Sequence, residues 1–73
     1  MRFFRDSDEK TYDKVKRRLD SVSLPATQDW ANTTLWTLQE GLEKAHDKAA
    51  LEQARTHAVA LLAAVDSLLD RAD

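Results

Sequence analysis

The sequence of 73 residues has no cysteine, a single proline and a single glycine. Without cysteine, disulfides, thiol nucleophiles and zinc-finger ligand sets are excluded. One glycine is too few for the glycine-rich loops that cradle phosphate groups. No apolar run approaches the roughly 20 residues that cross a membrane, and the opening residues lack the apolar stretch of a signal peptide. We therefore expect a single domain with no membrane contact and a cytoplasmic location.

Residues with catalytic or metal-binding potential are sparse. The two histidines, His46 and His57, would lie about 16 Å apart along a continuous helix, so they cannot share a metal within one chain. Neither has the spacing of a zinc motif, and no serine lies at helical spacing from a histidine. The sequence also lacks a nucleophile-elbow pattern. These absences predict a protein that is not an enzyme and that binds no metal and no cofactor.

Two apolar stripes of helical period fill the C-terminal two thirds of the chain. At about 100° per residue, the first stripe keeps within about 40° of one line and consists of Ala31, Leu35, Leu38, Leu42, Ala45 and Ala49. The second stripe falls on the opposite side of the same helix and consists of Leu51, Ala54, Ala58, Leu61, Leu62, Val65, Leu68 and Leu69. One straight helix cannot bury both sides in a small domain, so the inversion predicts a turn near residues 46–48.

The pattern predicts an all-α fold in which a short N-terminal helix precedes a long antiparallel helical hairpin. We expect the helices at about residues 8–20, 27–46 and 48–71 of a three-helix arrangement. Thr27 and Asp47 are the expected N-caps of the second and third helices, because their side-chain oxygens can accept hydrogen bonds from the first turn.

Some features of the hairpin leave alternatives open. Residues 21–25 end in proline and are expected to be a linker, because the residue before proline is pushed out of the helical region. Gly41 is expected to be tolerated inside the second helix or to be a close-packing point, and an early helix end there is the alternative. The rival architecture is one gently bent helix over about residues 28–71 that is completed by a second copy of the chain.

The net charge of −2 conceals a strong polarity along the chain. Residues 1–18 carry seven basic and four acidic side chains, a local charge of +3, whereas residues 19–73 carry four basic and nine acidic ones, a local charge of −5. Such polarity favours docking on a charged surface. The alternative is that the two parts neutralise each other within the folded bundle.

The two tryptophans occupy different positions on the second helix. Trp30 borders the first apolar stripe and is expected at the edge of the core. Trp36 points away from that stripe, so two interpretations stay open. Either the first helix covers it with Tyr12, Val15 and Leu19, or it is an exposed anchor for a protein partner, a role in which tryptophan is over-represented.

The N-terminal segment combines arginines with aromatic rings and continues into a basic helix. Such residues can anchor and steer a complex with an acidic protein surface. Together with the outward-pointing tryptophan, they define the predicted partner-binding residues, which are Arg2, Phe3, Phe4, Arg5, Lys14, Arg17, Arg18 and Trp36. Direct contact with nucleic acid is disfavoured, because acidic residues interrupt the basic ones and the sequence pI is about 5.6.

In its short length, lack of cysteine and high charge, the chain resembles small phage-encoded regulators that bind host machinery such as RNA polymerase. That resemblance implies a non-enzymatic protein that binds and modulates a larger protein, with an inhibitor of host transcription as one form. The alternative function is a dimeric structural protomer or a small DNA-binding regulator. A homodimer is compatible with both interpretations.

Overall fold

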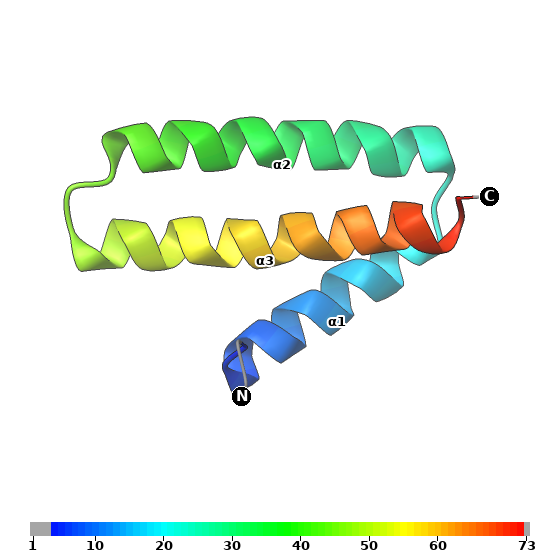
Figure 1. Ribbon diagram of the computed structural model, residues 1–73, viewed down its shortest axis with the longest axis horizontal. Helices are drawn as coiled ribbons and strands as arrows, with labels where there is room; N and C mark the ends of the chain where they lie inside the picture. The colour runs from blue at the N-terminus through cyan, green and yellow to red at the C-terminus, as the bar shows by residue number, and fades with distance from the viewer. Residues whose placement is uncertain (1–3, 73) are drawn as a thin grey trace.

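The computed structural model describes residues 4–72 and contains three α-helices, α1 (Asp6–Asp20), α2 (Leu24–Lys44) and α3 (Lys48–Asp70). Helices α2 and α3 form an antiparallel hairpin, and α1 packs on α3 (Figure 1). This arrangement confirms the predicted all-α fold with a short first helix and a long hairpin. The rival architecture of one long helix is wrong, because the chain leaves the helical conformation at residues 45–47.

Helix α1 begins at Asp6, two residues before the predicted start. Arg5 is the N-cap, and its backbone N–H donates to Asp8 Oδ2 at 2.8 Å. The first turn carries Asp6, Asp8 and Glu9, where carboxylates interact favourably with the positive end of the helix dipole. Asp8 therefore lies in the first turn and accepts a hydrogen bond from the N-cap residue.

Helix α2 starts earlier than the proline suggested. Ser23 is the N-cap and its Oγ accepts a hydrogen bond from Ala26 N at 3.2 Å. Pro25 lies in the first turn, where its missing N–H has no intrahelical partner to lose. The predicted N-cap Thr27 is therefore wrong, and its Oγ1 donates to Ser23 O at 3.0 Å from inside the helix.

The second helix continues without a break through Gly41 to Lys44. A Cβ at Gly41 would meet no atom within 4 Å, so this glycine is tolerated and is not a close-packing point. Asp47 is the N-cap of α3, and its Oδ1 accepts a hydrogen bond from Ala50 N at 2.8 Å. The predicted cap at Asp47 and the predicted turn are both confirmed.

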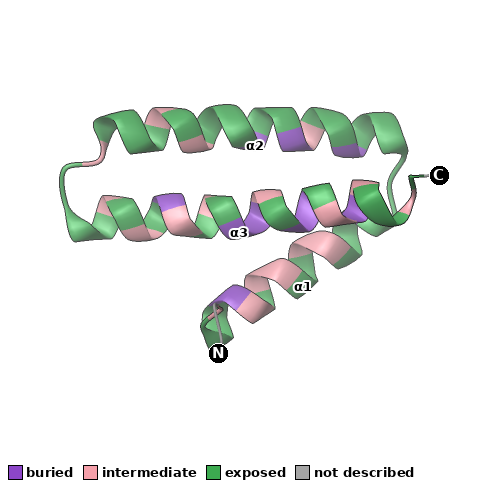
Figure 2. Ribbon diagram, in the orientation of Figure 1, coloured by how far each residue is buried: buried purple, intermediate pink, exposed green. Residues whose placement is uncertain are grey.

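The buried positions of α2 and α3 lie mostly on the sides that face another helix (Figure 2), and most of them carry small side chains. The buried residues of the hairpin are Thr27, Ala31 and Thr34 on α2 and Ala54, Val59, Ala60, Ala63, Ala64 and Ser67 on α3. Helix α1 adds Leu19, which joins Ala31 and Ala64 in a core cluster with Trp30 packed against it. The predicted position of Trp30 at the edge of the core is confirmed.

The predicted contact stripe of α3 is wrong in its details. Five of its residues are exposed, namely Leu51, Ala58, Leu62, Val65 and Leu69, and so are Leu35 and Leu42 of the predicted α2 stripe. The predicted Ala54 is buried, together with Ala60, Ala63 and Ala64, which the stripe did not include. The physical reason is that α3 packs against two helices, α1 and α2, on two different sides. Its buried surface is therefore centred between them, where small residues permit close approach, and several large aliphatic side chains remain at the margins.

Candidate interaction surfaces

The inward side of α1 is fixed to α3 by polar contacts at its start. Asp8 is buried and forms an ion pair with Arg55, and Arg5 Nη1 pairs with Glu52 Oε2 at 2.7 Å. The hydrogen bond from Arg55 is the main cause that holds the pKa of Asp8 below its ordinary value. These pairs determine which side of α1 faces α3 and which side faces solvent.

The outward side of α1 carries a cluster of positive charge. We call Lys10, Lys14, Arg17 and Arg18 the basic face; with Asp13 they line a shallow surface groove. Their spacing of four, three and one residues places them on neighbouring positions of one helix side. All four are exposed, and within residues 4–72 none of them takes part in an ion pair. Their charge is therefore directed at solvent.

Of the predicted N-terminal binding residues, Lys14, Arg17 and Arg18 belong to the basic face, whereas Phe4 and Arg5 do not. Arg5 pairs with Glu52 on α3. Phe4 is half-buried, and its ring centroid lies 6.0 Å from that of Tyr12 in a tilted arrangement. The ring of Phe4 therefore packs on α1. Arg2 and Phe3 lie outside the described residues.

Trp36 lies on the outer side of α2 and is 61% exposed. Helical geometry places it about 140–160° around α2 from Ala31 and Thr34, which are buried in the hairpin. Coverage by the first helix is therefore wrong, because α1 packs on α3 instead. The structure separates Trp36 from the basic face, since the two belong to different helices without an extensive mutual contact.

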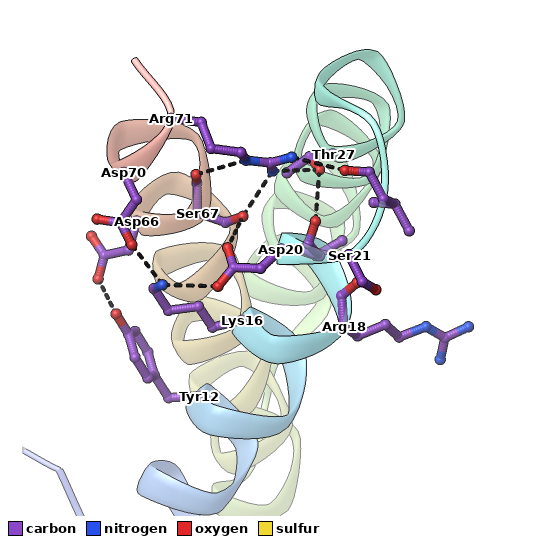
Figure 3. Close-up of polar contacts among 12 residues, drawn as sticks. Tyr12, Lys16, Arg18, Asp20, Ser21, Thr27, Asp66, Ser67, Asp70 and Arg71 are labelled. Carbon is purple, nitrogen blue, oxygen red and sulfur yellow. Dashed lines mark hydrogen bonds and ion pairs between the residues drawn. The ribbon is translucent and has the colours of Figure 1, made fainter. Parts of the chain in front are cut away.

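A polar network joins the ends of the three helices around Arg71 (Figure 3). The Arg71 guanidinium donates to Val22 O, Thr27 Oγ1 and Ser67 Oγ, each at 2.8 Å. Ser67 Oγ in turn donates to Asp20 Oδ1 at 2.6 Å, which is the main cause of the lowered pKa of Asp20. One side chain thereby connects the α1–α2 linker, the start of α2 and the end of α3.

A second group of polar contacts attaches the middle of α1 to α3. Lys16 Nζ lies 2.6 Å from Asp70 Oδ2 and 3.1 Å from Asp20 Oδ2. These carboxylates raise the pKa of Lys16 above its ordinary value, with the hydrogen bond to Asp70 as the main cause. The Tyr12 hydroxyl donates to Asp66, and this hydrogen bond raises the pKa of Tyr12 to about 12.

The polar groups buried in these two networks all have hydrogen-bond partners. Within residues 4–72, no buried side-chain nitrogen or oxygen lacks a hydrogen-bond partner. The same residues contain no group of three or more metal-ligating side chains and no helix long and apolar enough to cross a membrane. The two networks hold the three helices together.

The basic face includes one residue that the sequence analysis did not select. Lys10 lies four residues before Lys14 and seven before Arg17, a spacing that a helical projection of the N-terminal segment reveals. Arg71 was also not selected, because contacts with distant Val22 and Thr27 leave no local pattern in the sequence.

No protein family, curated protein or solved structure matches the chain. Function is therefore inferred from the surface chemistry of the three helices.

Proposed function

We propose that the protein is a non-enzymatic interaction protein that binds a larger protein carrying an acidic surface. The observation that carries this proposal is the basic face, four cationic side chains on one side of α1 that form no ion pair within residues 4–72. Opposite charge across an interface accelerates encounter and selects among partners. One form of this function is a regulator that binds a transcription complex in the cytoplasm. The small phage-encoded regulators that the chain resembles act in this way.

The position of α1 supports a role in recognition. Its inner side is attached to α3 by ion pairs from Arg5, Asp8 and Lys16, so the helix presents its outer side without refolding. A preorganised surface loses less conformational entropy on binding than a mobile segment does. Trp36 on α2 supplies a separate exposed aromatic anchor for a partner large enough to reach around the hairpin.

The experiment compares two charge-reversal variants in affinity capture from cells that make the protein. The test variant combines Lys14→Glu and Arg17→Glu on the basic face. The control combines Lys44→Glu and Lys48→Glu, an equal change of charge at exposed positions around the hairpin turn. We expect the wild type and the control to retain the same protein, and the test variant to bind it at least tenfold more weakly.

Salt and nucleic acid provide the second comparison. Binding of the captured protein should weaken as salt shortens the screening length below about 10 Å. Equal capture by all three proteins would overturn the proposal. A steep log-linear salt dependence in gel shifts with duplex DNA, lost in the test variant, would instead assign the basic face to phosphate binding.

A further inference from the structure

An apolar face on the open side of the hairpin is left uncovered by α1. It consists of aliphatic side chains with exposed fractions between 42% and 67%, which we call the leucine face, namely Leu35 and Leu42 on α2 and Leu51, Leu62, Val65 and Leu69 on α3. From these fractions, the leucine face leaves roughly 550 Å² of side-chain surface in water. Exposed apolar surface of that extent is at the upper end of what monomers show in one patch.

The exposed positions of α3 follow a heptad repeat. Leu51, Ala58 and Val65 are seven residues apart, and Leu62 and Leu69 fall four residues after the last two of them. Alternating steps of four and three residues along the exposed side are the seam of a coiled coil, in which each residue packs between side chains of a facing helix. Arg55 occupies the one charged position of this seam. The heptad pattern therefore indicates that a helix packs on the exposed side of α3.

The leucine face extends from α3 onto α2. Leu35 and Ala31 of α2 share a groove with Val65 and with half-buried Leu61 and Leu68 of α3, and the polar residues Gln28, Asp29 and Asn32 of α2 also line it. Leu42 lies two helical turns beyond Leu35 on the same side of α2. The face therefore spans both helices of the hairpin and suits a partner that also presents two antiparallel helices.

We propose that the leucine face pairs with the same face of a second copy of this chain, so that two hairpins form an antiparallel four-helix core. The area supports this occupant. When fully covered, the leucine faces of two copies bury roughly 1,100 Å², and the flanking Ala58, Leu61 and Leu68 bring the total into the range of about 1,200–2,000 Å² that stable interfaces bury. A two-fold interface of this kind is self-complementary and closed.

Charge and side-chain size determine the orientation of the pair. If the two α3 helices were parallel, Arg55 would face its own copy across the seam, and two Arg55–Asp8 ion pairs would meet with no apolar side chain to pack on. In the antiparallel register centred near Ala60, Arg55 faces Val65 of the other copy, and small Ala58 faces large Leu62. The same register places Leu51 opposite Leu69, and antiparallel helix dipoles also attract.

Sedimentation velocity on the full chain tests the pairing. We expect the wild type to shift with concentration from the 8.3 kDa of one chain toward twice that mass. Leu62→Lys should weaken self-association at least tenfold, whereas the control Thr33→Lys, at an exposed position on the outer side of α2, should leave it unchanged. A wild type that stays monomeric at millimolar concentration, or a loss of association in the control alone, would overturn the proposal. In the monomeric case the face would belong to a helix of another protein.

Cross-linking tests the orientation without changing the centre of the seam. The chain has no cysteine, so single variants Leu51→Cys and Leu69→Cys each carry one thiol. In the antiparallel pair, identical thiols lie about 27 Å apart along the seam, and unlike thiols face each other. We expect oxidation of the mixture to give a disulfide between the two variants and oxidation of each alone to give little. Efficient cross-linking of each variant alone, or none in the mixture, would overturn the antiparallel pair.

Discussion

Arg71 joins three segments that meet at the ends of the helices. Its planar guanidinium donates to Val22 O, Thr27 Oγ1 and Ser67 Oγ at once, a geometry that the single ammonium of lysine cannot reproduce. Thr27 and Ser67 are fully buried, so their hydroxyl groups need these partners. The polar network thus takes the place that a large apolar residue would hold in a bigger core.

Tyr12 gives the bundle a dependence on alkaline pH. Its neutral hydroxyl donates to Asp66, and the pKa of Tyr12 rises from 10.0 to about 12 in the folded chain. A folded-state pKa above the unfolded value means that the contribution to stability is complete below about pH 10. It is lost as the pH rises from about 10 through 12. We expect urea unfolding to show a steeper decline over this range in the wild type than in Tyr12→Phe, which keeps the loss due to the raised pKa of Lys16.

The tyrosine titration can be followed directly, because the chain has one tyrosine. Tyrosinate absorbance should appear with a midpoint near pH 12 in the folded protein and near pH 10 in urea. Asp66→Asn is the matched variant, since it keeps the shape of the acceptor and removes its charge. A wild-type midpoint near pH 10 in the folded protein would contradict the hydrogen bond.

At the scale of the helices, the sequence predicts the turn better than the packing. The inversion of the apolar stripe depends on periodicity alone, and the break at residues 45–47 follows it. Leu51 and Val65 were expected inside but are exposed, because a stripe does not show that α3 has two neighbours at different angles. The start of α2 was placed too late, because proline ends one helix and also suits the first turn of the next.

Gly41 is a position where the sequence of α2 is not optimal for helix stability. It lies inside the helix, its φ is not positive, and a Cβ would meet nothing within 4 Å. Gly41→Ala should therefore stabilise the fold by about 0.5–1 kcal/mol, because alanine loses less backbone entropy on folding. For a domain of this size that corresponds to a rise of about 2–8 °C in Tm. A fall in Tm on thermal melting, with Gln39→Ala as the control, would contradict the helical environment described for Gly41.

At the scale of the whole molecule, the basic face and the leucine face belong to different sides. Lys14, Arg17 and Arg18 lie together on the outside of α1, where helical spacing alone places them. The leucine face could be identified only from the tertiary structure. The sequence shows which residues are apolar, but it does not show which of them α1 leaves exposed. A pair of chains joined through leucine faces carries two basic faces and can engage a partner at two points.

The last prediction concerns thermal stability and protein concentration. A chain of 73 residues buries only about 60% of the surface of its unfolded form, and alanines make up much of this core. Pairing through the leucine faces adds apolar burial that one copy lacks, so mass action should raise Tm by about 3–5 °C per tenfold increase in concentration. Leu69 is the most exposed residue of the leucine face. In the variant Leu69→Lys, Tm should not depend on protein concentration. Circular-dichroism melts over a hundredfold range check this difference, and a constant wild-type Tm would contradict it.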